Sequence, residues 1–294
     1  MENLQTILEE KKTVFWKEYS KYKRINNILL GASVAVIIAD YIWLLPLNQI
    51  LGFVVIGVML AGLLFYSSFM KKNISTKVST YLKEFYLLTS NYAFDHERRD
   101  GFSAVMEEKL QLNDFVDAHI LKDIIHSGSR NLVRYDYRSF QVKAADYVGY
   151  REINKKRTPV FLGKLFVIKA GTSFPQRGMI YLKPAKETTV PNYGPDDVLD
   201  LHKLVDNEKM VVYASEENTS FMTNQLLKVV GAMTPNAYLV DATFAFNGDI
   251  LTIALSYSDE LMAVPLKEAF NPIPLETFKD NISDIHQILN HLAD

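Results

Sequence analysis

The chain has 294 residues, a formal net charge of −2 and no cysteine. A charge so close to zero provides no overall basic field and argues against a nucleic-acid partner. The lack of cysteine excludes disulfides, thiolate metal sites and cysteine nucleophiles, and it agrees with a reducing compartment.

Two apolar runs, residues 28–45 and 50–70, dominate the first quarter of the sequence, and only a short uncharged loop separates them. A membrane-spanning helix needs about 20 mostly apolar residues. The second run has no charge, and the first contains only Asp40, whose cost of about 3 kcal/mol is outweighed by the surrounding aliphatic residues. We therefore expect two transmembrane helices in a hairpin. Asp40 is then an intramembrane acid, and its carboxylate is expected to reach the headgroups near Pro46.

The basic residues that flank this hairpin set its expected direction. Positively charged flanks tend to stay in the cytoplasm, and the connecting loop carries no charge. We expect a multi-pass protein of the cell membrane with both termini cytoplasmic. The flanking bases are Lys11, Lys12, Lys17, Lys21, Lys23 and Arg24 before the first run, and Lys71, Lys72, Lys77 and Lys83 after the second.

Amphipathic segments at residues 2–24 and 74–92 lie on either side of the apolar runs. In the second, apolar residues recur at spacings of 4, 3, 4, 3 and 4 between Ile74 and Tyr92, which is a heptad pattern. Because a hairpin returns both segments to one membrane face, we expect them to pack antiparallel as a stalk. The alternatives are that 74–92 packs on the soluble domain or across a homo-oligomer.

Residues 93–294 are expected to form a soluble α+β domain with a mainly antiparallel sheet and flanking helices. A first helix is expected from Ser103 to Ile125, ended by a Ser-Gly-Ser-Arg turn at 127–130. Strands follow at 132–137, 140–150, 158–170 and 179–182, with a polar turn at 154–157.

The last third of the chain alternates between strands and helices. Residues 184–195 are expected to be an exposed loop, and Asn247-Gly248 a tight turn. The expected elements are a strand at 210–215, a helix at 219–230 ending at Gly231, strands at 239–246 and 250–257, and a helix at 275–292.

Several segments in a fixed order together resemble a bacterial family of membrane-anchored proteins known only as a domain of unknown function. The segments are 161–167 after a polar turn, 210–217 leading into Leu226-Leu227, 246–254, and a closing helix that begins with Leu275 and Phe278. The resemblance covers roughly residues 75–292 and supports the architecture. It carries no catalytic residues over to this chain.

No arrangement of residues typical of catalysis, of a cofactor or of a metal stands out. A nucleophile elbow, a phosphate-binding loop, a dinucleotide-binding glycine turn and a zinc-protease motif are all missing. The six histidines are interpreted as surface or structural residues. Three acids near the central hairpin, Asp136, Asp146 and Glu152, are the ones for which convergence in a site is conceivable.

The most suggestive polar feature is the basic group Arg151, Lys155, Lys156 and Arg157. If this turn faces a bilayer, each base gains about 1 kcal/mol from anionic lipid. The alternative interpretation is a solvated turn that discourages edge-to-edge aggregation.

Three functional hypotheses follow. The leading one is a membrane-tethered cytoplasmic binding or scaffolding module for a protein partner or lipid headgroups, without catalysis or cofactor. The second is a membrane-associated enzyme with a carboxylate site around Asp136 and Asp146. The third is an oligomeric transport component, which requires Asp40 at a helix interface.

Overall fold

The structure is a computed structural model that describes residues 2–95, 98–110, 126–174, 177–183, 201–215, 224–233, 238–258 and 271–293. The chain divides into two compact units. Of the described residues, 2–85 form the first unit and all others belong to the second.

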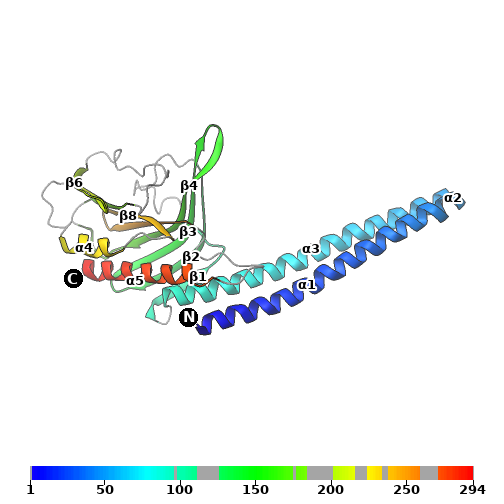
Figure 1. Cartoon of the computed structure of the whole chain (residues 1–294), viewed down its shortest axis with the longest axis horizontal. Coiled ribbons are helices and arrows are strands. Elements are labelled where there is room, and N and C mark those ends of the chain that lie inside the picture. Colours follow the sequence, from blue (N-terminus) through cyan, green and yellow to red (C-terminus); the bar gives the residue numbers. More distant parts are fainter. Residues whose placement is uncertain are drawn as a thin grey trace. The chain divides into compact units, whose positions relative to one another are not determined.

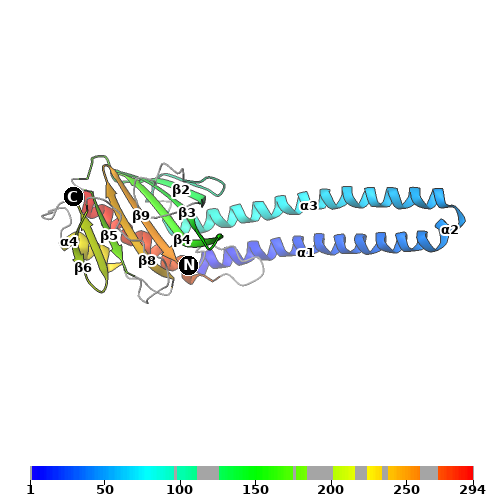
Figure 2. The same ribbon diagram turned by 90° about the horizontal axis from the view of Figure 1, so that it is seen from above.

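The first unit is a helical hairpin (Figure 1). Helix α1 (Glu2–Ala39) continues through a π-helical turn, η1 (Asp40–Leu44), and a short helix, α2 (Leu45–Leu47), and α3 (Gln49–Phe94) returns beside it. Figure 2 shows α1 and α3 running antiparallel. Both are long and apolar enough to cross a membrane, and only 6% of the residues in each apolar window are buried. Such windows are mostly buried in the core helix of a soluble protein, so this exposure agrees with membrane anchoring.

The tip of the hairpin is shaped by Pro46 and Asn48. Proline has no N–H to donate to the carbonyl four residues back, so the regular helix cannot continue through it. The π-helical turn lies just before Pro46. Asn48 is extended, and its side-chain Oδ1 accepts a hydrogen bond from Leu51 N at 3.1 Å, which caps the start of α3.

Asp40 lies in the π-helical turn and is only 6% exposed. Neither carboxylate oxygen has a hydrogen-bond partner among the residues that the structure describes. The side chain is thus buried, which differs from the exposed position near the headgroups that the sequence predicted. Tyr41 and Trp43 beside it are 69% and 75% exposed, as an aromatic belt at an interface requires.

Side-chain pairs join α1 and α3 near the open end of the hairpin. The rings of Phe15 and Tyr81 stack with centroids 4.4 Å apart and planes 10° from parallel. Lys11 pairs with Glu84 at 2.7 Å, and Lys77 pairs with Glu18. These contacts give the antiparallel pairing expected of the two amphipathic segments, although α3 passes from the first unit to the second between residues 85 and 86.

Within the described residues, the second unit is built on a nine-stranded sheet whose neighbouring strands all pair antiparallel, in agreement with the expected mainly antiparallel sheet. Its order is β1-β2-β3-β4-β9-β8-β5-β7-β6. The strands are β1 (Asp100–Val105), β2 (His126–Tyr137), β3 (Phe140–Ile153), β4 (Lys156–Lys169), β5 (Gly178–Leu182), β6 (His202–Asp206), β7 (Met210–Ala214), β8 (Leu239–Asn247) and β9 (Ile250–Tyr257). Helix α4 (Asn224–Ala232) packs against α5 (Ile273–Ala293).

Helix α5 covers one face of this sheet (Figure 2). Its apolar residues recur three and four apart, so they form one stripe. From this stripe, Phe278 contacts Phe94 of α3, Phe166 of β4 and Tyr257 of β9, with ring centroids 5.5, 6.5 and 6.2 Å away. The opposite face carries a second apolar cluster that includes Leu165.

Three local expectations were wrong. The segment 103–105 belongs to strand β1 rather than to a helix, while residues 111–125 lie outside the described residues. The Ser-Gly-Ser-Arg segment is not a turn, because 126–130 pair with β3 between 146 and 150. Gly231 does not end its helix, since α4 continues through Ala232. The predicted loop at 184–195 and residues 219–223 also lie outside the described residues.

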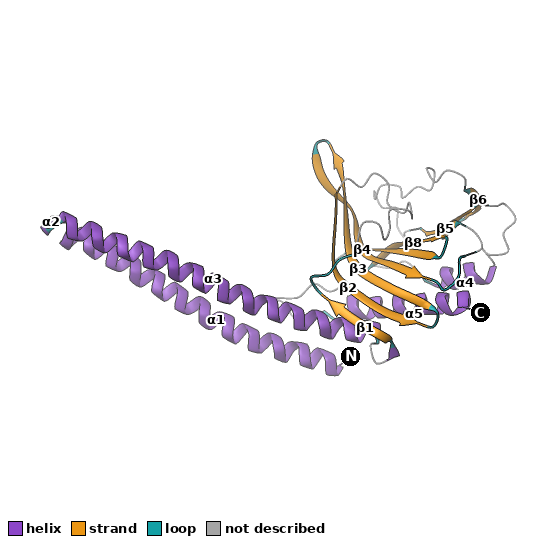
Figure 3. Ribbon diagram, turned by 180° about the vertical axis from the view of Figure 1, so that it is seen from behind, coloured by secondary structure: helices purple, strands orange, loops and turns teal. Residues whose placement is uncertain are grey.

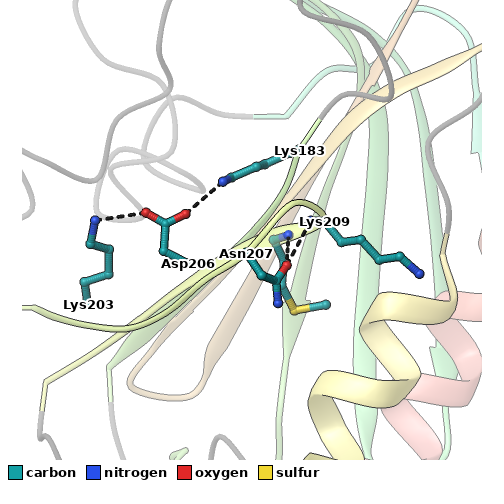
Figure 4. A network of polar contacts seen from close by, with 6 residues as sticks. Lys183, Lys203, Asp206, Asn207 and Lys209 are labelled. Carbon is teal, nitrogen blue, oxygen red and sulfur yellow. Dashed lines mark hydrogen bonds and ion pairs between the residues drawn. The ribbon is translucent and has the colours of Figure 1, made fainter.

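The edge strand β6 was not predicted, and a polar network explains how it is held (Figure 4). Asp206 accepts hydrogen bonds from Lys183 at 2.8 Å and Lys203 at 3.0 Å. These bonds, that of Lys183 foremost, lower the pKa of the Asp206 carboxyl. In the following turn, Asn207 Oδ1 accepts from the backbone N–H groups of Lys209 and Met210.

Gly163 determines how closely β4 and β9 approach each other. A Cβ at this position would lie 1.9 Å from the carbonyl oxygen of Leu255. Gly163 also pairs with Ser256 at the end of the β4–β9 register. We expect Gly163→Ala to lower the free energy of unfolding by about 1–3 kcal/mol, because backbone rather than a flexible side chain must move. Thermal melting of the full-length chain in mild detergent measures this.

The matched control is Gly128→Ala in β2, where nothing lies within 4 Å of an added Cβ. Its effect should stay within about 0.5 kcal/mol. Equal melting temperatures for the two variants would contradict the steric argument.

Candidate functional site

A two-stranded ribbon extends from the sheet where β3 and β4 outrun their neighbours (Figure 3). Within the described residues, β2 pairs with β3 as far as Tyr150, and β9 pairs with β4 from Gly163 onward. We call residues 151–159 the basic ribbon. It contains all four basic residues singled out by the sequence analysis, and 152–157 are exposed.

The tip of the basic ribbon is a two-residue turn made by Asn154 and Lys155. Both have positive φ, 53° and 60°, as a primed hairpin turn requires. Asparagine tolerates this conformation, and glycine is preferred at the second position. A lysine there costs on the order of 1 kcal/mol, so the tip places a positive charge where stability alone favours glycine.

The charges of the basic ribbon are divided between its two faces. Cross-strand partners share a face, so Arg151 with Thr158 and Ile153 with Lys156 lie on one side. Ile153 is 44% exposed there. We call this side the Arg151–Lys156 face. On the other side Glu152 lies opposite Arg157, so opposite charges are adjacent.

The three acids singled out from the sequence do not converge. Asp136 pairs with Gln141 of β3. Along β3, Gln141 is five residues, or roughly 17 Å, from Asp146, and Asp146 is six residues, or roughly 20 Å, from Glu152. The carboxylate site of the enzyme hypothesis is therefore not assembled by Asp136, Asp146 and Glu152.

Asp146 is instead part of an ion pair with a buried partner. Lys164 of β4 is 1% exposed, and its Nζ lies 2.5 Å from Asp146 Oδ1 and 5.3 Å from the ring centroid of Phe278. Asn131 of β2 donates its amide N–H to Asp146 Oδ2. Both carboxylate oxygens are engaged, so Asp146 is occupied in linking β2, β3 and β4 rather than free to act as a base.

His286 of α5 is the centre of a second polar cluster. Arg99 Nη2 lies 2.9 Å from Nδ1, Tyr135 Oη lies 2.9 Å from Nε2, and the ring of Tyr137 stacks at 4.3 Å. Because a guanidinium only donates, Nδ1 must be the acceptor and Nε2 carries the proton. Burial, and then the charge of Arg99, lowers the pKa of His286 to about 3. A histidine with that pKa stays neutral near pH 7, and its two ring nitrogens link α5 to Arg99 and to Tyr135 of β2.

Asp241 of β8 is a residue that the sequence analysis missed. It is 2% exposed, and its Oδ2 has no hydrogen-bond partner within the described part of the chain. Burial raises the pKa of this carboxyl to about 7. Its cross-strand partner is Ser256. The available sequence signal was a lone acid in an otherwise apolar strand.

Within the described residues, no three histidine, aspartate or glutamate side chains lie close enough together to hold a metal ion. His96 and His119 lie outside those ranges.

Comparisons with known proteins add little to this geometry. No protein-family model and no curated protein matches the sequence. One solved structure, the crystal structure of the mycobacterial trehalose monomycolate transport factor A, TtfA, aligns with a TM-score of 0.36 and 12% identity over 70% of this chain and 94% of that chain. At that TM-score the alignment carries no argument about function. The resemblance to the family of unknown function stays a prediction.

The raised pKa of Asp241 makes stability depend on pH. Between about pH 4 and pH 7 the folded state keeps a proton that the unfolded chain has released, so this contribution is complete below the unfolded pKa and is lost as the pH rises through about 7. Asp241→Asn stays neutral at every pH. We expect its melting temperature in detergent to exceed that of the wild type at pH 8, by the equivalent of up to about 4 kcal/mol, and to match it at pH 4.

The control for this experiment is Asp249→Asn in the β8–β9 turn, whose side chain is 41% exposed beside Lys169; its melting temperature at pH 8 should differ from that of the wild type less than that of Asp241→Asn does. A constant difference between Asp241→Asn and wild type from pH 4 to pH 8 would contradict the assignment.

Proposed function

We propose that this protein is a membrane-tethered binding module that presents the basic ribbon to an acidic protein partner. The observation that carries the proposal is the ribbon itself, which extends past its neighbouring strands and places bases and an exposed isoleucine on one face. A lysine at a turn position where glycine is preferred supports a role for its charge, because local strain persists where function requires it.

The two-faced distribution of charge favours a protein over a lipid surface as the partner. An anionic bilayer attracts all four bases by total charge. A protein partner that binds the Arg151–Lys156 face contacts Arg151, Ile153 and Lys156 together and does not contact Glu152 on the other face. Complementary charge of this kind sets partner choice and association rate. Pro159 lacks a backbone donor, so simple strand addition at this edge is disfavoured.

Anchoring and direction are part of the same proposal. The two long apolar helices support insertion of the hairpin in a membrane. The uncharged tip and the basic flanks of both helices favour cytoplasmic termini. The oligomeric transport hypothesis gains no support from Asp40, which is buried within its own chain.

The basic ribbon is tested by photo-crosslinking in native membranes. A photoreactive residue in place of Ile153 in the full-length chain should give a band of discrete added mass. Arg151→Gln with Lys156→Gln should reduce that band about tenfold or more, because it removes two charges from the reading face. The matched control, Glu152→Gln with Arg157→Gln, should retain it.

The same gel separates the alternatives. A crosslink to lipid barely changes the mobility of the chain and would make the membrane surface the partner. Equal loss in the two double variants, or no crosslink at all, would contradict the proposal and favour a solvated turn.

Direction is tested with fusions at the C-terminus. A green fluorescent protein fused there should be fluorescent and an alkaline phosphatase inactive, because the first folds in the cytoplasm and the second requires an oxidising compartment. The opposite pattern would overturn the proposed topology.

A further inference from the structure

The outer surface of α1 forms a shallow, largely open concavity of about 500 Å³ where the first apolar run begins. It is lined by Trp16, Ser20, Lys23, Arg24, Asn27 and Ile28. An aromatic ring, two cations, two neutral hydrogen-bonding groups and one aliphatic residue thus share a single helix face. We propose that this concavity binds one anionic phospholipid, with its phosphate at Lys23 and Arg24.

The depth of the two cations fits a lipid phosphate. Arg24 lies four residues from Ile28, which corresponds to roughly 6 Å along the helix. The polar layer on each side of a bilayer is about 5–8 Å thick. When the apolar run fills the hydrocarbon core, Lys23 and Arg24 therefore lie at the level of the headgroups. This step rests on the proposed insertion of the hairpin.

The charges of Lys23 and Arg24 are available for a ligand. Neither side chain makes an ion pair or hydrogen bond with the described part of the chain, and both are exposed. Nearer the open end of the hairpin the situation differs, because Lys11 and Lys77 are paired with Glu84 and Glu18.

Helix α3 adds two cations at the same depth. Lys11 faces Glu84, and seven residues along α1 Glu18 faces Lys77, seven residues back on α3. If this antiparallel pairing continues for five more residues, Lys23 lies level with Lys72, and the next residue along, Arg24, lies level with Lys71. Each cation near an anionic membrane surface gains about fivefold in affinity, and the concavity adds a fixed position to that general attraction.

The other lining residues suit the rest of a lipid. Asn27 and Ser20 offer hydrogen bonds to a polar headgroup, and Ile28 offers an apolar contact to the first acyl carbons. The ring of Trp16 is held edge-on by Tyr19, with centroids 5.2 Å apart and planes at 83°. Tryptophan is enriched at this level of membranes because its ring is apolar and its N–H is polar.

Native mass spectrometry of the full-length chain in mild detergent tests the proposal. The probes are phosphatidylglycerol, phosphatidylcholine of equal chain length, and inorganic phosphate. We expect one phosphatidylglycerol to be retained in preference to phosphatidylcholine. Lys23→Gln with Arg24→Gln should weaken that binding about tenfold to thirtyfold. The matched control, Lys17→Gln with Lys21→Gln, removes two charges from the same helix outside the concavity and should change it less than threefold.

Equal weakening in both double variants would overturn the proposal, because it would show diffuse attraction without a site. Competition by millimolar inorganic phosphate would also overturn it by identifying a free anion as the ligand.

Tryptophan fluorescence provides a second measurement, which does not depend on the folding of the Lys23→Gln, Arg24→Gln variant. The chain contains two tryptophans, Trp16 and Trp43, so Trp43→Phe leaves Trp16 as the only reporter. Its emission should shift when phosphatidylglycerol is added and stay constant with phosphatidylcholine, and an unchanged emission with both lipids would overturn the proposal. Failure of membrane insertion is measured separately by extraction of membranes with alkaline carbonate, so the two ideas fail independently.

Discussion

The transfer of the apolar hairpin from water to hydrocarbon is the constraint on which the other features of the first unit depend. Side chains such as Leu64, Phe65 and Ile50 are 72%, 78% and 80% exposed, and such side chains surround both helices. Each favours an apolar environment by about 1.5–3 kcal/mol when fully buried. A helix that is apolar on all sides is stable only where its whole surface is covered. Neither helix covers the other to that extent, which supports the proposed insertion of the hairpin in lipid.

This constraint explains how polar groups are distributed along the hairpin. Where the helices leave the apolar region, aromatic stacking and ion pairs between α1 and α3 take over, as Phe15 and Tyr81 illustrate. At the tip, Pro46 and the capping side chain of Asn48 reverse the chain within a few residues. The side chains of Lys23 and Arg24, next to the apolar region, make no ion pair with the described residues, which supports the proposed contact with a lipid headgroup.

In the second unit, a buried ion pair and aromatic packing hold together the central strands from which the basic ribbon extends. The Lys164–Asp146 pair and the aromatic residues around Phe278 hold β2, β3, β4 and α5 together. Breaking a buried pair by removing one partner is costly, so these residues fix the central strands. Gly163 allows β9 to approach β4 closely at the point where the basic ribbon begins. The basic ribbon is a continuation of two of these central strands, β3 and β4.

The sequence was most informative where a periodic pattern is long or where one turn has a single solution. The apolar runs, the Asn247-Gly248 turn and the stripe of α5 belong to this class, and so does the basic turn at 154–157. The start of β2 was missed because the residues at 127–130 favour a turn locally, whereas pairing with β3 overrides that preference. Strand β1 was missed because residues 103–105 were assigned to an expected helix, although they pair with β2. Register also decided that Asp136 and Asp146 stay apart. The burial of Asp241 depends on its neighbours in space, which spacing along the chain does not reveal.

Extraction of membranes with alkaline carbonate tests the central claim most directly. Peripheral proteins are released by this treatment, whereas a chain whose apolar helices lie in hydrocarbon stays with the lipid. The account predicts that the full-length chain remains in the membrane pellet together with a known multi-pass protein. Recovery of the intact chain in the supernatant would contradict it.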